Sequence, residues 1–426
     1  MPPESAKFQK IRPAPISWIV FLFTISMIII SLIPVVFPAL IATSFTTVSD
    51  LQQFGVSGGE VDPFEAGPLA APLFITSGVI FGLAILHFKN KLPQLSKAFE
   101  FIFNFEVSKK IAIITMIVIL AVYIAASAPE LAEDQQYEDY VGVKNRVDIW
   151  SPDQITGSFE PHVTYFFIWS SIVLFGNDAV IPFLASISLL ITVYFFTKEI
   201  THKRFAGIVA MVILLQSNIF LTFDTTVAYT NFWVLFYLLS LYFVYKAWPL
   251  SPISYVMSIV SKALTVTFLP MSIYFILRSS ISRKKKMIIA CTIIGIVIIG
   301  AVYSSNANLV VVQDEPFIAN EFWIGFTSFA AQLRFDSLVV LFLIPLIVGL
   351  LFSASKNKHA ESIMVLISGM LFAAPLLTGF TDQTNQPYRF VPLITFFAVG
   401  VGVLLSKKTS LLSSKKSKLD KSHHQE

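Results

Sequence analysis

The sequence predicts an all-α polytopic membrane protein, and three features of the chain predict it. Of the 426 residues, 55% are hydrophobic and only 13% are charged, against about 25% in an average soluble domain. Apolar runs recur along nearly the whole chain and are long enough to cross a bilayer core of about 30 Å. The charges between these runs are sorted by sign. This composition excludes a soluble globular protein, a disordered protein and a disulfide scaffold.

Ten apolar segments are predicted to cross the membrane as helices. They are 16–43, 69–88, 111–128, 178–197, 205–223, 226–245, 287–303, 337–354, 362–379 and 390–406. The first is predicted to be an anchor span rather than a cleaved signal peptide, because its apolar run exceeds the 7–15 residues of a signal-peptide core. We find no soluble globular domain and no internal repeat between these segments.

A further apolar stretch, 250–277, contains Pro252, Pro270 and a single charge, Lys262. It is too short for two full crossings and long for one. It therefore predicts a hairpin of two short helices that turns near Lys262, which brings the total to roughly 12 helices. Non-helical backbone at membrane depth persists only where protein or a watery cavity satisfies its polar groups.

The charge distribution predicts the orientation of the chain. With the N-terminus in the cytoplasm and alternating sides, 25 of the 30 Lys and Arg residues lie inside and 19 of the 26 acids lie outside. This agrees with the positive-inside rule. We expect a multi-pass protein of the cell membrane with both termini cytoplasmic and a basic tail, 407–426, facing anionic lipid. The net charge of +4 is the sum of these opposed distributions and indicates no nucleic-acid partner.

The longest and most acidic outer loop is predicted at 129–177. It contains the string PELAEDQQYEDY, whose candidate site residues are Glu133, Asp134, Tyr137, Glu138, Asp139 and Tyr140. Adjacent carboxylates can supply a general base or ligands for Mg²⁺ or Mn²⁺, or can serve solubility alone. Composition leaves these three roles open.

Two further polar residues stand at predicted helix boundaries. His162 precedes an aromatic amphipathic helix in FEPHVTYFFIWSSIVLFGND and is either a turn residue with a hydrogen-bond partner or a ligand. Asp224, in TFDTTVAYT, either caps the following helix or belongs to a site.

The third outer loop, 304–336, is predicted to contain an interfacial helix. Phe322, Phe326, Phe329 and Leu333 are spaced at helical intervals and share one face. The helix either packs on the outer surface or forms a lid or acceptor wall.

Two cations lie within or next to predicted membrane segments, where charged side chains are usually functional. Lys262 is the only charge between residues 247 and 277, and Arg389 lies in QTNQPYRFVPL, at the outer end of the last span. Lys262 is predicted to bind an anion rather than to extend its ammonium group to the membrane surface. Arg389 is predicted either to bind a phosphate through two hydrogen bonds or to anchor the helix at the membrane interface. Acids and two cations at one membrane face suit a substrate with a lipid tail and a phosphate head. The chain contains no P-loop, GxGxxG, HExxH or GxSxG motif.

The order of these features resembles the GT-C superfamily of membrane glycosyltransferases. The branch it resembles contains protein O-mannosyltransferases and the aminoarabinose transferase that modifies lipid A. The matching elements are Glu133–Asp134 with Tyr137, then Pro161 to Tyr165, then Lys262 with Leu269–Pro270, and then Tyr388–Arg389–Phe390 with Pro392. The match covers roughly 111–406, so 1–110 is interpreted as two additional N-terminal spans and a cytoplasmic linker.

The resemblance implies a hexosyltransferase that moves a sugar, with inversion, from a polyprenyl- or dolichyl-phosphate donor to a glycan, lipid or protein acceptor outside the membrane. Asp134 would be the catalytic base, with Glu133 or Asp139 as alternatives. Lys262 and Arg389 would bind the donor phosphate. The residues expected to shape the site are Tyr137, Glu138, Asp139, His162, Tyr165, Asp224 and Tyr388. A divalent cation, Mg²⁺ or Mn²⁺, would be held by Glu133 and Asp134.

The chain departs from the family pattern at two motifs. The acidic pair is Glu-Asp rather than Asp-Glu or Asp-Asp, with a second Glu-Asp at 138–139, and the element at 161 is Pro-His rather than Pro-Pro. Two other readings stay open. One is a secondary transporter or lipid flippase, which broken helices and intramembrane charge favour. The other is a non-catalytic membrane subunit whose acidic loop binds a partner.

Overall fold

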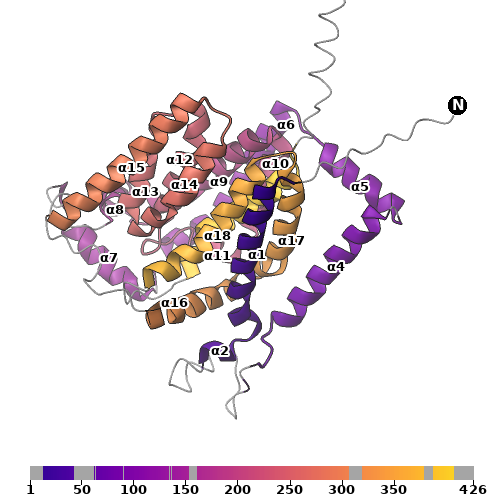
Figure 1. Ribbon diagram of the computed structural model, residues 1–426. Helices are drawn as coiled ribbons and strands as arrows, with labels where there is room; N and C mark the ends of the chain where they lie inside the picture. Colours follow the sequence, from indigo (N-terminus) through magenta and orange to yellow (C-terminus); the bar gives the residue numbers. More distant parts are fainter. Residues whose placement is uncertain are drawn as a thin grey trace, which may run out of the picture.

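The computed structural model describes residues 13–42, 62, 64–89, 91–133, 135, 137–152, 161–306, 319–378 and 387–406. In these residues every regular element is a helix (Figure 1). Seven helices are long and apolar enough to cross a membrane, namely Pro15–Val36, Ala70–Phe88, Lys109–Ala132, Val180–Thr201, Arg283–Tyr303, Ser337–Ala354 and Pro387–Leu404. The prediction of a helical membrane protein is confirmed at this level.

Most predicted spans coincide with one helix each. These helices are α1 (Pro15–Val36), α4 (Ala70–Phe88), α6 (Lys109–Ser127), α9 (Val180–Thr201), α15 (Arg283–Asn306), α17 (Ser337–Ala354), α18 (His359–Thr378) and α19 (Val391–Leu404). The agreement follows from the length of the apolar runs, because a helix rises 1.5 Å per residue. A four-residue helix, α2 (Ala39–Ala42), follows α1.

The predicted single span 205–223 is wrong, because the chain breaks there into α10 (Arg204–Leu215) and α11 (Asn218–Thr222). Ser217 begins the second helix, and its hydroxyl accepts a hydrogen bond from the amide of Phe220 at 3.1 Å. The same hydroxyl donates to buried Asp336, which in turn accepts from the amide of Val339 at 3.1 Å and caps α17. The buried polar pair satisfies both helix starts.

The span predicted at 226–245 begins later than expected, as α12 (Phe232–Lys246). Residues 223–231 form an irregular segment between α11 and α12, which we call the 223–231 turn. Its backbone polar groups are satisfied in part by side chains of the outer loop, described below. The difference matters because this turn carries Asp224 and Tyr229.

The predicted hairpin at 250–277 is confirmed and turns at Lys262. It consists of α13 (Leu250–Ser261), the 3-10 helix η3 (Ala263–Phe268) and α14 (Leu269–Arg278). The Tyr255 hydroxyl donates to the carbonyl of Thr265 at 3.0 Å across the turn. The Ser258 hydroxyl donates to the carbonyl of Trp233 in α12 at 2.6 Å. Tyr255 thus satisfies one backbone carbonyl of the turn, and Ser258 ties the turn's first helix to α12.

The core forms where α19 packs between α9, α10, α17 and α18. Nearly every residue of α19 is buried. Gly402 allows the close approach, because a Cβ at this position would lie 2.4 Å from Cγ2 of Thr197 and 3.0 Å from the carbonyl oxygen of Ala206. Small residues at such crossings bring helix backbones together in membranes. This packing fixes the position of α19, which directly follows Tyr388 and Arg389.

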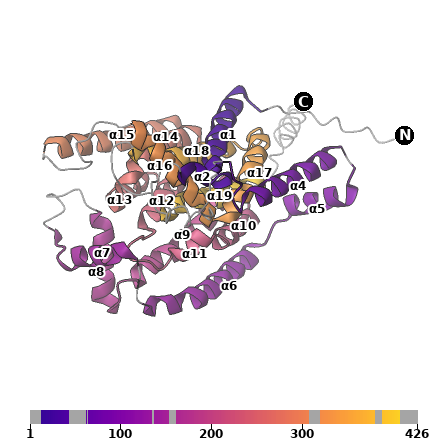
Figure 2. The same cartoon turned by 90° about the horizontal axis from the view of Figure 1, so that it is seen from below.

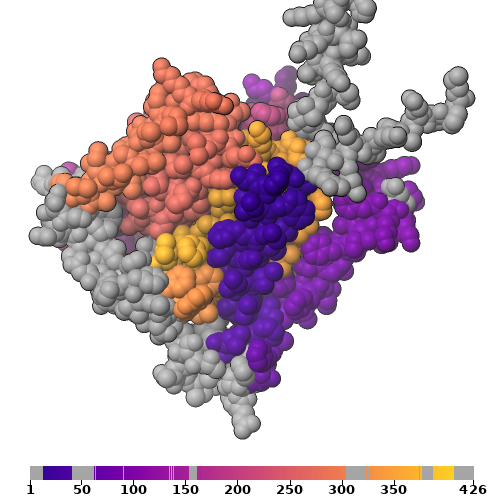
Figure 3. Space-filling view, viewed as in Figure 1, coloured from indigo at the N-terminus to yellow at the C-terminus, as the bar shows by residue number. Residues whose placement is uncertain are grey.

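α1 packs across α17 and α18, as Figure 3 shows on one face of the molecule. α4 packs against α17 alone among the long helices, and most of its side chains are exposed. α6 is similarly exposed and runs along the edge of the molecule in Figure 2. The exposed side chains of α4 and α6 are mostly large and apolar, which suits lipid contact.

Three helices lie at the end of the molecule opposite α5 (Figure 1). They are α7 (Glu138–Asp148), α8 (His162–Phe175) and α16 (Ala319–Ala331). The prediction that α8 is amphipathic is wrong, because Phe166 and Trp169 on its exposed side are as apolar as buried Ile168. A helix that touches lipid on one side and protein on the other needs no polar face.

A helix is present in the predicted third outer loop, namely α16, and it is followed by the 3-10 helix η4 (Gln332–Phe335). Its position at a membrane interface stays a prediction. Phe326, Phe329 and Leu333 are buried on one face, whereas Trp323 is 60% exposed on another. The one-sided pattern at helical spacing is therefore confirmed, and the buried face packs on the bundle.

Candidate functional site

Lys262 and Tyr388 meet at the centre of the candidate site. The ammonium group of Lys262, at the turn of the hairpin, donates a hydrogen bond to the hydroxyl of Tyr388. The same Nζ lies 4.4 Å from the centroid of the Tyr388 ring, within range of a cation–π interaction. Tyr388 belongs to the 3-10 helix η5 (Pro387–Phe390) before α19 and is buried. Two segments 126 residues apart thus converge at one point.

The acidic loop joins this point through Asp139, which is bonded to Tyr229 of the 223–231 turn. The rings of Tyr229 and Tyr388 stack with centroids 4.4 Å apart and an interplanar angle of 19°. The Tyr229 hydroxyl donates to Oδ2 of Asp139 at 2.8 Å. Burial, followed by the bond to Asp139, raises the pKa of Tyr229 above its ordinary value, so Tyr229 keeps its proton and acts as the donor. We call Asp139, Tyr229, Lys262, Tyr388 and Arg389 the tyrosine-bridged cluster.

Arg389 lies beside this pair of tyrosines. It is close enough to Lys262 and Tyr388 to act on both electrostatically. The neighbouring Phe390 stacks on Phe329 of α16, with centroids 4.0 Å apart and an interplanar angle of 15°. Because Phe390 follows Arg389 directly, this stack holds the arginine's backbone close to α16. The two predicted phosphate-binding cations are therefore brought together.

The first part of the acidic loop is held against the 223–231 turn by hydrogen bonds. Gln135 donates to the carbonyl of Thr225 at 3.1 Å and accepts from the amide of Val227 at 2.9 Å. The hydroxyl of Thr225 donates to Glu130 at 3.1 Å. Tyr137 donates to the carbonyl of Thr222 at 3.3 Å and packs edge-on against Tyr229. These contacts satisfy turn backbone and bring Tyr137 to the cluster, as predicted.

Asp224 lies in this turn and is only 1% exposed. Its Oδ2 accepts from the hydroxyl of Ser127, at the end of α6, at 3.0 Å. Its own carbonyl accepts from Ser186 of α9 at 2.7 Å. Burial raises the pKa of Asp224 to about 6, and the neighbouring hydroxyls of Tyr123 and Ser127 act in the opposite direction. The capping alternative for Asp224 is wrong, because Asn231 precedes α12 and its first turn carries no side-chain cap.

The predicted catalytic pair is described only in part. Glu133 is exposed at the end of the short helix after α6, and Asp134 lies outside the described residues. Glu138 begins α7, and its side chain is likewise outside them. Of the candidate bases, the one that the described structure joins to Lys262 is Asp139.

His162 and Tyr165 lie on α8, which borders the cluster. The indole of Trp150 donates to Nδ1 of buried His162 at 3.3 Å. Arg146 of α7 donates to the Tyr165 hydroxyl at 3.3 Å. The bond from Trp150 fits the first of the two roles considered for His162, a turn residue with a hydrogen-bond partner, rather than a ligand. The link from α8 to the site is Thr164, whose hydroxyl donates to the carbonyl of Ser261 at 3.1 Å, next to Lys262.

Sequence reasoning missed three contributors, Tyr229, Glu130 and Gln135. Tyr229 fell within a predicted span, so its hydroxyl looked like a membrane-embedded group. The polar string DTTVAYTN is the signal that could have identified the turn, because five Thr, Asn and Asp residues among eight interrupt an apolar helix. Gln135 and Glu130 carried no signal of their own.

Within the described residues, no three His, Cys, Asp or Glu side chains gather as ligands for a metal ion. The predicted Mg²⁺ or Mn²⁺ site at Glu133 and Asp134 falls partly outside these residues and stays a prediction. The arrangement that the structure does describe joins two cations, Lys262 and Arg389, to the carboxylate of Asp139 through a pair of stacked tyrosines. No family model, no curated protein and no solved structure matches the chain.

Proposed function

We propose that the chain is a GT-C-like membrane glycosyltransferase. It would transfer a sugar from a polyprenyl- or dolichyl-phosphate donor to a glycan, lipid or protein acceptor. In this proposal about ten helices and the hairpin span a cell membrane, both termini are cytoplasmic, and the tyrosine-bridged cluster faces the other side. The observation that carries it is the bond from Lys262 to Tyr388, which is stacked on the Asp139-bonded Tyr229.

The cationic half of the cluster supports a phosphate site. Lys262 and Arg389 come from the hairpin and from the start of α19 and approach the same tyrosine. A cation about 4 Å from a phosphate contributes on the order of 4 kcal/mol at an effective dielectric near 20, before desolvation is subtracted. Because negative charge grows on the leaving phosphate, preorganised cations stabilise the transition state more than the ground state.

The acidic half supports a general base. The acceptor hydroxyl or amide would attack the anomeric carbon while its proton passes to a carboxylate. The bond from that carbon to the phosphate oxygen would break, its electron pair would stay on the phosphate, and the configuration would invert. Asp134 is the base that the resemblance implies, and Asp139 is the candidate that the described contacts favour. A single base is sufficient for direct displacement, unlike in a glycosidase.

The test is incubation of the purified protein with a panel of polyprenyl-phosphate sugars and simple acceptors. Mass spectrometry would measure released polyprenyl phosphate and glycosylated acceptor. The proposal predicts both products with at least one donor, and loss of both in Lys262→Ala. Intact donor across the whole panel would contradict it.

A transporter or lipid flippase is the second candidate, and one observation favours it. Arg278 at the end of α14 pairs with Glu361 of α18, which is 2% exposed, so charge is buried in the bundle away from the cluster. The hydroxyl of Ser17 in α1 donates to the same carboxylate. Flux across proteoliposomes without any covalent product would support this candidate. A third candidate, a non-catalytic subunit, would retain function after joint replacement of Glu133, Asp134, Glu138 and Asp139.

A further inference from the structure

α5 (Pro93–Asn104) joins α4 to α6 and was not predicted as a helix from the sequence. No residue of α5 is buried. A helix of 12 residues is marginal in water by itself, so α5 needs a surface on which to lie. The surface must be found outside the described bundle.

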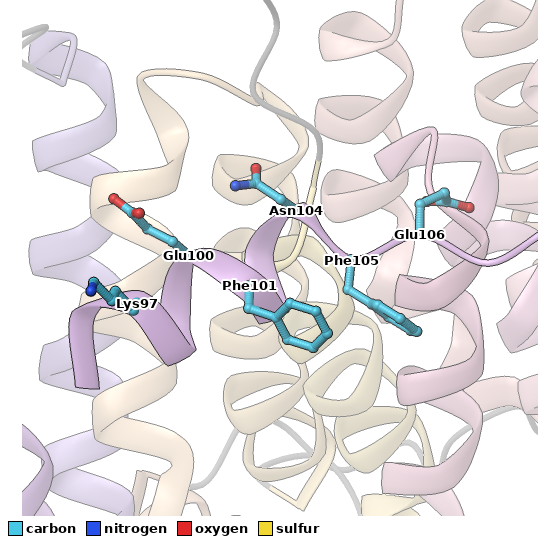
Figure 4. Close-up of a pocket in the computed structure, with 6 residues that line it drawn as sticks. All are labelled: Lys97, Glu100, Phe101, Asn104, Phe105 and Glu106. Carbon is cyan, nitrogen blue, oxygen red and sulfur yellow. The ribbon is translucent and has the colours of Figure 1, made fainter. Parts of the chain in front are cut away.

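α5 has two chemically different sides. Figure 4 shows Phe101 and Phe105 pointing to one side of the chain and Glu100, Asn104 and Glu106 to the other. The four large apolar side chains near its C-terminal end are exposed, with Phe101 at 67%. This separation is typical of a helix that lies in a membrane interface. An open pocket of about 530 Å³ lies between the two sides and is lined by Lys97, Glu100, Phe101, Asn104, Phe105 and Glu106.

The contacts of α5 set its depth at the ends of four apolar helices. α4 ends at Phe88, and α6 begins at Lys109. The turn between α9 and α10 supplies Lys203, whose Nζ donates to the carbonyls of Phe103 at 2.9 Å and Ile102 at 3.4 Å. A cation bound to the last carbonyls of a helix also interacts favourably with the negative end of the helix dipole. These contacts hold α5 at the level where the long apolar helices stop.

A belt of lysines lies at the same level. Lys89 and Lys91 precede α5, Lys97 is within it, and Lys109 and Lys110 open α6. All five side chains are exposed. The nearby acid Glu106 is engaged by Arg204, whose amide donates to it at 3.0 Å. Exposed lysines beside an apolar helix face complement anionic headgroups.

We propose that α5 is a membrane-surface helix. Its phenylalanines insert among the acyl chains of one leaflet, and Lys89, Lys91 and Lys97 bind the headgroups of anionic phospholipids. The proposal does not depend on the glycosyltransferase activity, and failure of either leaves the other standing.

The first test compares two labels on opposite sides of α5. Cys291 is the only cysteine of the chain, so Cys291→Ser provides a background for Ile102→Cys or Asn104→Cys, each carrying a nitroxide. In nanodiscs, we expect the label at 102, which is 41% exposed, to be accessible to oxygen and the label at 104 to a water-soluble nickel chelate. Equal access of both labels to the chelate would overturn the insertion.

The second test measures lipid choice. The full-length protein would be reconstituted in mixtures of phosphatidylcholine and phosphatidylglycerol, and the lipids retained on the protein would be quantified by mass spectrometry. Replacing Lys89, Lys91 and Lys97 with Gln should lower phosphatidylglycerol retention by up to about fivefold for each lysine. The matched Arg variant keeps the charge and should keep the retention. Unchanged retention in the Gln variant would overturn the headgroup assignment.

Discussion

Tyr229 and Tyr388 stack face to face, with ring centroids 4.4 Å apart. One ring comes from the turn between α11 and α12, and the other from the start of α19. Each hydroxyl bonds to a charged group, Asp139 for Tyr229 and Lys262 for Tyr388. The stack therefore keeps an acid and a cation at a fixed separation, and the proposed sugar transfer requires such positioning of its base and its phosphate-binding cation.

Lys262→Ala should reduce kcat/KM for the lipid-phosphate donor by about 10²–10³-fold, because removing one preorganised donor to a developing charge typically costs this much. Lys262→Arg should retain part of the activity. The matched control is Lys144→Ala, an exposed lysine of α7. Initial rates of carrier-phosphate release provide the measurement. Equal rates for Lys262→Ala and Lys144→Ala would remove Lys262 from the phosphate site.

Asp134→Asn should abolish sugar transfer while expression and thermal stability stay unchanged, because Asn cannot accept the acceptor's proton. Asp139→Asn is the parallel variant. If Asp139 is the base instead, Asp139→Asn should abolish sugar transfer and Asp134→Asn should leave it unchanged. Full turnover by both single variants and by their double variant would exclude a base in the outer loop.

The bond between Tyr229 and Asp139 should be measurable as a coupling. Tyr229→Phe keeps the stack on Tyr388 but removes the hydroxyl, at a cost of about 1 kcal/mol in the free energy of unfolding. Once Asp139 has been replaced by Asn, Tyr229→Phe should cost less, and a double-mutant cycle would report the difference. Additive effects would show that the two residues act independently.

Asp224 should make stability depend on pH. Its pKa rises from 3.8 unfolded to about 6 in the folded chain, so the folded state binds more protons between these values. Stability should therefore fall as pH rises from about 4 through 6, by on the order of 3 kcal/mol. Asp224→Asn should remove this slope and match the wild type near pH 4. Unfolding midpoints between pH 4 and 8 would show it, and parallel curves for both proteins would contradict it.

Phe329→Ala should lower donor turnover without touching a charge, because it removes the stack that holds Phe390 and thus Arg389. A buried Phe→Ala change costs about 3–5 kcal/mol of stability. Trp323→Ala, on the exposed side of the same helix, is the control and should have little effect on either quantity. A Phe329→Ala protein that is less stable but has unchanged donor turnover would limit α16 to packing.

The sequence predicted most helices and the turn at Lys262, because apolar length and a lone charge between two prolines are local signals. It did not predict the break before Asn218, since the serine there is stabilised by Asp336, 119 residues away. It did not predict α5, whose apolar residues are scattered among Lys and Glu. Tyr229 and Asp139 are 90 residues apart, and no pattern along the chain links them. Lys262, Tyr388 and Arg389 were predicted for one site, and the structure brings them together.

The most direct measurement of the central claim is release of polyprenyl phosphate from a purified sugar donor. Wild-type protein and Lys262→Ala would be assayed side by side with an acceptor present. The account predicts release coupled one-to-one to glycosylated acceptor by the wild type and a loss of at least tenfold in the variant. Donor that stays intact with the wild type, or equal release by both proteins, would contradict it.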